Sequence, residues 1–105
     1  MEEVIFTRKT NIVHLRKNDK SVWFDLQFGE LDYPFFLNFC NVNLSDKLIA
    51  ELESSKILTV EPKLCRKEEF HCNQHTDVYV KPRFGYTTEK VTAILIDILN
   101  RMDNE

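Results

Sequence analysis

Four side chains that could bind a metal ion lie within eleven residues of this chain: Cys65, His71, Cys72 and His75. Zinc takes thiolate and imidazole ligands in a tetrahedral arrangement, most often from pairs of closely spaced residues. Only Cys72 and His75 have such a spacing, because Cys65 lies seven residues before Cys72. His71 and Cys72 are neighbours, and adjacent side chains on an extended chain point in opposite directions. We therefore expect no metal site and no cofactor.

The same residues raise two catalytic alternatives. A thiolate nucleophile at Cys72 would need the imidazole of His75 or His14, oriented by Asp77. A nuclease with two histidines as acid and base would use His14 and His75. No local signature of a cysteine enzyme surrounds Cys72, and nothing in the sequence brings the two histidines together. We expect a protein that is not an enzyme, and a small Cys/His enzyme is the third hypothesis.

A basic and aromatic segment, KPRFGY at residues 81–86, has the chemistry of an RNA-binding strand, in which rings stack on bases. The match to such modules is poor, because the first glycine of their motif is absent and Pro82 interrupts the strand. The net charge of −3 also disfavours nucleic acid as a partner. Nucleic-acid binding or regulation is therefore the second hypothesis. It would use the basic residues of segments 8–20 and 81–83, namely Arg8, Lys9, Arg16, Lys17, Lys20, Lys81 and Arg83.

Aromatic and acidic residues are interleaved in residues 21–40, SVWFDLQFGELDYPFFLNFC, which hold seven of the chain's twelve rings. A small protein cannot leave so many rings in water, so part of this segment must be core. The side chains that we expect to be buried are Trp23, Leu26, Phe28, Phe35, Leu37 and Phe39. Alternation along the strands places some of Phe24, Tyr33 and Phe36 on the outer face.

The acids of this region predict a binding surface for a cationic protein. Residues 21–61 hold seven acids and two bases. Tyr, Trp and Phe are frequent anchors of protein interfaces, and carboxylates beside them steer a basic partner. The predicted partner-binding residues are Asp25, Glu30, Asp32, Tyr33, Glu51 and Glu53.

The length of 105 residues predicts one domain, residues 1–105, with enough chain for a core without metal or disulfide. Hydrophobic residues make up 43% and charged residues 30%, which is typical of a globular protein. No apolar signal segment precedes the three cysteines, and no run approaches the roughly 20 apolar residues of a membrane span. We therefore expect a cytoplasmic protein with free thiols and no membrane partner.

Two helices are expected, at about residues 45–55 and 88–102. Ser45 and Thr87 are good N-caps. The second helix carries an apolar stripe, Val91, Ile94, Leu95, Ile98, Leu99 and Met102, and Asp97 and Asn100 lie away from this stripe.

Strands are expected at residues 3–8, 11–16, 21–28, 33–40, 57–61 and 76–81, with a loop at 63–75. In the last strand, Val78 and Val80 share one face, and Asp77, Tyr79 and Lys81 share the other. Strands and helices do not alternate strictly. The fold class is therefore α+β: a single compact domain with an antiparallel or mixed β-sheet of about 4–6 strands and both helices packed on one face.

In its size, acidic balance, lack of a secretion signal and lack of a catalytic motif, the chain resembles the small cytoplasmic immunity proteins of bacterial toxin systems. The resemblance covers the whole chain as a type and carries no residue-by-residue motif, because these proteins vary widely in sequence. It implies a non-enzymatic inhibitor that binds a basic, nuclease-like toxin, either by plugging its active site or by locking a neighbouring surface. This is our first hypothesis.

Overall fold

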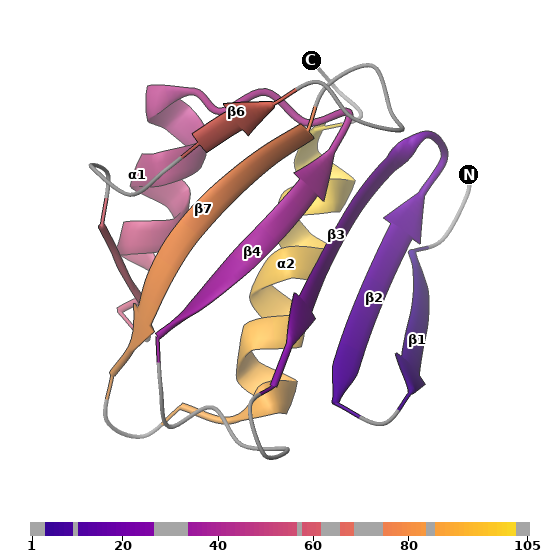
Figure 1. Ribbon diagram of the computed structural model, residues 1–105, viewed down its shortest axis with the longest axis horizontal. Coiled ribbons are helices and arrows are strands. Elements are labelled where there is room, and N and C mark those ends of the chain that lie inside the picture. Colours follow the sequence, from indigo (N-terminus) through magenta and orange to yellow (C-terminus); the bar gives the residue numbers. More distant parts are fainter. Residues whose placement is uncertain are drawn as a thin grey trace.

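The structure is a computed structural model that describes residues 4–9, 11–26, 34–56, 58–61, 66–68, 75–83 and 86–102. Within these residues the elements are β1 (Ile5–Lys9), β2 (Ile12–Lys17), β3 (Lys20–Asp25), β4 (Phe35–Cys40), α1 (Asp46–Ser54), β5 (Leu58–Val60), β6 (Arg66–Glu68), β7 (His75–Pro82) and α2 (Thr88–Met102). All strand pairs are antiparallel, in the order β1-β2-β3-β4-β7-β5. Both helices lie on one side of the sheet (Figure 1), which confirms the α+β expectation.

β6 corrects one sequence-based expectation, since it lies within the segment that we expected to be a loop. Its three residues pair with the start of β7, in the register Arg66↔Asp77 to Glu68↔His75. β4 occupies the other edge of β7, so β5 and β6 follow one another along the same edge. The backbone of β7 thereby gains partners along both edges, and this tertiary pairing outweighs the weak strand propensity of a charged tripeptide.

The two helices begin where their caps predict. The Ser45 hydroxyl accepts a hydrogen bond from the Leu48 amide at 3.1 Å, and the Thr87 hydroxyl accepts one from the Lys90 amide at 3.2 Å. Each bond satisfies an amide that has no partner within its helix. Neither helix among the described residues is long and apolar enough to cross a membrane.

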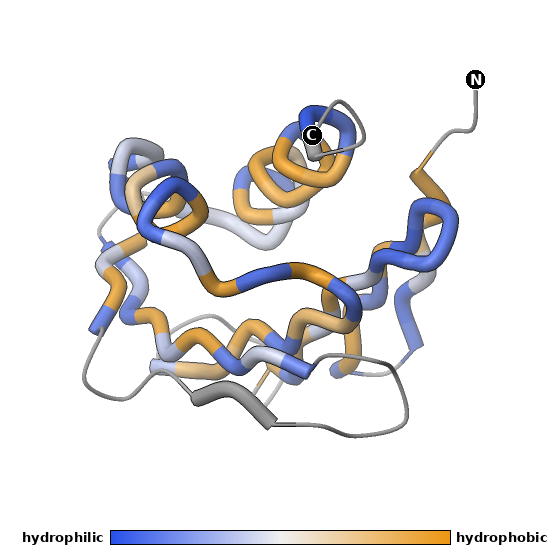
Figure 2. The backbone as a smooth tube through the Cα atoms, turned by 90° about the horizontal axis from the view of Figure 1, so that it is seen from above, coloured by the Kyte–Doolittle hydropathy of each residue, from blue (hydrophilic) through white to orange (hydrophobic). Residues whose placement is uncertain are grey.

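The core fills the space between the sheet and the two helices, where hydrophobic residues of both layers face each other (Figure 2). Every second strand residue points into it. Its fully buried members from the helices are Leu48 and Leu52 of α1 and Val91, Leu95, Ile98 and Leu99 of α2. The expected stripe of α2 is therefore the buried face, with Ile94 half-buried beside it. The side chain of Met102 lies outside the described part of the structure.

The aromatic segment contains one reversal of the predicted faces. Phe24 is fully buried, whereas Trp23 is 36% exposed, and we expected Trp23 in the core. The reason is strand periodicity: Val22, Phe24 and Leu26 form the apolar alternation that faces the helices. Trp23 and Asp25 must then point to the opposite face.

The rest of that segment follows the expectation as far as it is described. Leu26, Phe35, Leu37 and Phe39 are buried. Phe36 lies half-buried on the helix-free face, edge-on to Tyr79 with 4.8 Å between ring centroids. Phe28 and Tyr33 lie outside the described residues.

Candidate protein-binding site

One face of the sheet carries neither helix (Figure 2). Paired residues of five strands form a row across it. The strand registers pair Thr7 with His14, His14 with Trp23, Trp23 with Asn38, and Asn38 with Asp77. Directly paired residues of antiparallel strands point to the same face. This row therefore lies on what we call the helix-free face, and Trp23 is at its centre.

Apolar side chains are exposed on this face at the end formed by β1, β2 and β3. Trp23 is 36% exposed and Ile12 is 44% exposed, and Ile5 is exposed on the same face. Ile12 pairs across the strands with both Lys9 and Asp25, which are exposed as well. Ile12 therefore lies between a base and an acid and diagonal to Trp23, whereas Ile5 lies at the other end of the strands, opposite Arg16. Large exposed apolar side chains that cluster in this way mark interaction sites.

The opposite end of the row is polar and largely buried. His75 Nε2 lies 2.6 Å from Asp77 Oδ1, which is an ion-pair distance when the imidazole is protonated. Asn38 Nδ2 donates to the carbonyl oxygens of Trp23 at 3.2 Å and of Phe36 at 3.3 Å. The bond from Asn38 to the Trp23 carbonyl joins β4 to β3 and fixes the backbone that carries the exposed tryptophan.

Cys40 lies beside His75 in the strand register, a position that could join a thiol to an imidazole. Cys40 is disulfide-bonded, however, so the expectation of free thiols is wrong for this residue. A disulfide sulfur is not a thiolate, and Cys40 therefore supplies no nucleophile to His75 and Asp77. Cys72, which the sequence offered for that role, lies outside the described residues, as does Cys65.

The two histidines of the nuclease alternative lie on the same face but on separate strands. His14 is on β2 and His75 is on β7, with β3 and β4 between them. Three strand spacings separate them by about 14 Å. An acid and a base at this distance cannot both reach one reacting group.

A metal site is not formed by the part of the chain that the structure describes. That part holds no group of three or more His, Cys, Asp or Glu side chains that could bind a metal ion. Of the four candidate ligands, only His75 lies within it, and its contact is with Asp77.

The predicted acidic residues do not form one patch where they are described. Asp25 is exposed on the helix-free face, whereas Glu51 and Glu53 lie on α1, in the layer on the other side of the sheet. Glu51 Oε1 contacts Arg101 Nη1 at 3.2 Å and thereby connects α1 to α2. The other predicted residues, Glu30, Asp32 and Tyr33, lie outside the described residues.

The basic residues of the second hypothesis are also divided between the faces. The strand registers place Lys9, Arg16 and Lys81 on the helix-free face. They place Arg8, Lys17 and Lys20 on the face that carries the helices. Lys17 is only 6% exposed and donates to Asn100 on α2. Arg83 donates through Nε to Thr59 Oγ1 at 2.7 Å. These residues therefore do not line one continuous basic groove.

Comparison with protein-family models, with curated proteins and with solved structures finds no match to this chain. A functional proposal must then rest on the geometry of the helix-free face.

The residues that the sequence reasoning missed are the exposed Ile12 and the outward-facing Trp23. A signal for Trp23 was available, because Val22, Phe24 and Leu26 alternate as an apolar set and leave Trp23 on the opposite side. No comparable signal marks Ile12, since an isoleucine beside Val13 fits either face of a strand.

Proposed function

We propose that this chain is a non-enzymatic inhibitor that binds another protein through the helix-free face of its sheet. The observation that carries the proposal is the exposure of Trp23 at the centre of that face, beside the exposed Ile12. Tryptophan is among the residues most often found to dominate the energy of protein interfaces. A partner that covered both side chains would remove a large apolar area from water.

The support of Trp23 favours a preformed site. Trp23 lies in the interior of β3, paired on both sides with β2 and β4. Its carbonyl oxygen accepts the Asn38 amide, and its neighbour Phe24 is anchored in the core. A residue held in this way has little backbone freedom to lose on binding, which reduces the entropic cost of association.

The partner that we propose is a basic, nuclease-like toxin domain, with this chain as its cytoplasmic immunity protein. Asp25 supports this choice, because it is exposed on the helix-free face two residues after Trp23. The net charge of −3 acts in the same direction, since it attracts a cationic partner at long range.

A second candidate, binding of single-stranded nucleic acid, is favoured by the bases near the same tryptophan. His14 pairs directly with Trp23, and Arg16 lies on the same face two residues further along β2. On such a sheet, an aromatic ring can stack on a nucleobase while the basic side chains beside it contact the phosphates. The two candidates share Trp23 and differ in the sign of the charge that they require.

The decisive experiment therefore pairs two charge reversals. The wild-type chain is used to capture a protein from its native source, and a single-stranded oligonucleotide of mixed sequence is titrated in parallel. Asp25→Lys should weaken capture of a basic protein, whereas Arg16→Glu should preserve or strengthen it. For nucleic acid the order would reverse. If Trp23→Ala captures the protein partner as well as the wild type does, the helix-free face is not the binding site.

A further inference from the structure

We propose a second interaction site, independent of the first: the outer edge of β1 binds an extended, acidic and apolar segment of a partner protein as an added strand. β1 is the last strand of the sheet, and no described strand pairs with its outer edge. All five of its residues are exposed. In antiparallel sheets every second residue directs its N–H and C=O away from the paired strand, so this edge offers free main-chain groups.

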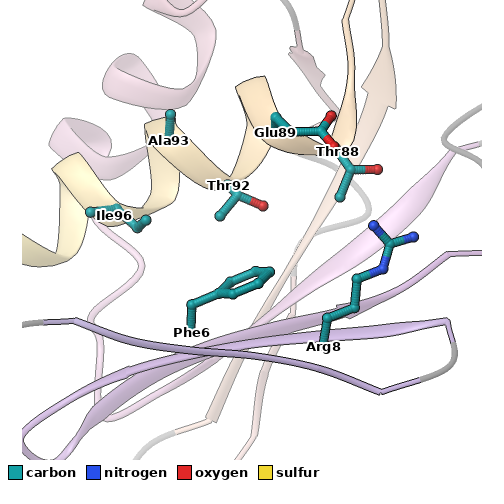
Figure 3. Close-up of a pocket in the computed structure, with 7 residues that line it drawn as sticks. All are labelled: Phe6, Arg8, Thr88, Glu89, Thr92, Ala93 and Ile96. Carbon is teal, nitrogen blue, oxygen red and sulfur yellow. The ribbon is translucent and has the colours of Figure 1, made fainter.

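A groove beside this edge distinguishes it from a plain sheet border. It has a volume of about 400 Å³ and lies between β1 and α2 (Figure 3). Phe6 and Arg8 extend toward the helix from the strand, and Thr92 points toward Phe6 from α2. Thr88, Glu89, Ala93 and Ile96 of the same helix also line the groove. Phe6 is 48% exposed. An added strand would direct alternate side chains to the helix side, where the groove can take an apolar one.

The charges of β1 identify the chemistry of the occupant. Arg8 and Lys9 are both exposed, and the five residues of the strand include no acid. They point to opposite sides of the strand, so a neighbouring strand meets Lys9 on the helix-free face and Arg8 on the helix side, where Glu89 of α2 also lines the groove. Opposite charges on directly paired residues stabilise a sheet, and like charges destabilise it. An acidic segment fits this edge.

A second copy of this chain fits the edge less well. Pairing two β1 strands would bring four cations of Arg8 and Lys9 into one small interface. Bases on an edge strand are a common means by which proteins prevent self-pairing. The same charges that discourage a copy of β1 select a partner strand of opposite charge.

The register then specifies the order of residues in the partner. All pairs in this sheet are antiparallel, so we expect the same of the added strand. Its acids lie opposite Lys9 and Arg8, any strand former lies opposite Thr7, and an apolar residue lies opposite Phe6. Read from its N-terminus, the segment is acid, acid, any residue, apolar.

The test uses a fluorescent peptide of this pattern, Ser-Asp-Glu-Thr-Leu-Thr-Ser, and the intact protein. We expect saturable binding that weakens with added salt and slower hydrogen exchange of the β1 amides in the complex. Two control peptides separate the contributions. One carries Lys-Lys in place of Asp-Glu, and the other has N-methylated amides that cannot pair with a strand. Both should bind about tenfold more weakly or not at all.

Matched protein variants locate the site. Arg8→Glu reverses a charge of the edge strand, and Ala93→Phe adds bulk to the lining of the groove. Each should weaken binding of the peptide about tenfold. Arg16→Glu makes the same charge change on β2, one strand in from the edge and opposite Ile5, and should leave peptide affinity within about twofold. Circular dichroism of each variant checks the fold. Peptide binding that leaves the β1 amides unprotected would overturn the proposal, as would self-association through β1 that excludes the peptide. Trp23→Ala tests the helix-free face and should leave peptide binding at the β1 edge unchanged. The proposal for the helix-free face and the proposal for the β1 edge can therefore be refuted separately.

Discussion

Lys17, at the end of β2, donates from its ammonium group to Asn100 Oδ1 on α2 at 3.0 Å, across 83 residues of sequence. The lysine is 6% exposed, so most of its side chain is removed from water, and its bond to Asn100 is partly buried. A buried charge is costly unless polar groups surround it. This bond therefore fixes α2 against the sheet at a point where the sequence shows only a polar residue on the outer side of a helix.

Replacing Asn100 by alanine should lower the free energy of unfolding by about 1–3 kcal/mol, because it removes an acceptor from a partly buried ammonium group. Asp97→Ala is the matched control. Asp97 is exposed and contacts Arg101 at 2.8 Å on the same helix, and the loss of such a pair costs about 0.5 kcal/mol. Urea unfolding of the two variants makes the comparison. Equal stabilities would mean that Lys17 does not depend on Asn100.

The buried stripe of α2 should be far more sensitive. Leu95 and Ile98 are fully buried, and truncation of either to alanine should cost about 2–5 kcal/mol once the cavity is included. A domain of this size has roughly 5–15 kcal/mol of stability, so the double variant should be largely unfolded. Chemical denaturation followed by circular dichroism measures both. If Leu95→Ala or Ile98→Ala lowered stability less than Asp97→Ala does, the buried face of α2 would have been assigned wrongly.

The reversal of Trp23 and Phe24 has its own thermodynamic signature. Phe24→Ala should cost about 3–5 kcal/mol, because the ring is fully buried and lies 5.4 Å from that of Phe35. Trp23→Ala should cost about 1 kcal/mol, since its ring is already partly in water. Guanidinium titrations of the two variants test the register of β3. If Trp23→Ala proved the more destabilising variant, the register of β3 would have to be shifted by one residue.

The disulfide at Cys40 predicts a thiol count. The chain has three cysteines, so alkylation of the denatured, unreduced protein should modify one of them, and alkylation after reduction should modify three. Reduction should also lower stability by about 2–4 kcal/mol. Mass spectrometry of the alkylated chain reads the count directly. Three reactive thiols without reductant would restore the original expectation of free thiols in a reducing cytoplasm.

The helices and most of the strands could be predicted because their signals are local. Caps at Ser45 and Thr87 and the stripe of α2 depend on spacing within one element. The face of Trp23 was harder, since two adjacent rings compete and the result depends on which strand neighbours cover them. The position of β6, the bond from Lys17 to Asn100 and the disulfide at Cys40 are tertiary, and no local pattern encodes them. The predicted acidic surface illustrates the same limit. Asp25 and Glu51 are both acids of residues 21–61, but they lie in different layers of the fold.

The most direct test of the central claim is the affinity of the captured protein partner for Trp23→Ala, measured by calorimetry beside the wild type. The control is Asp97→Ala, which changes an exposed acid of α2 in the other layer. We predict that Trp23→Ala weakens binding by about 2 kcal/mol or more, a roughly 30-fold loss of affinity, while Asp97→Ala stays within about 0.5 kcal/mol of the wild type. Equal affinities for Trp23→Ala and the wild type, with both proteins folded, would contradict the account.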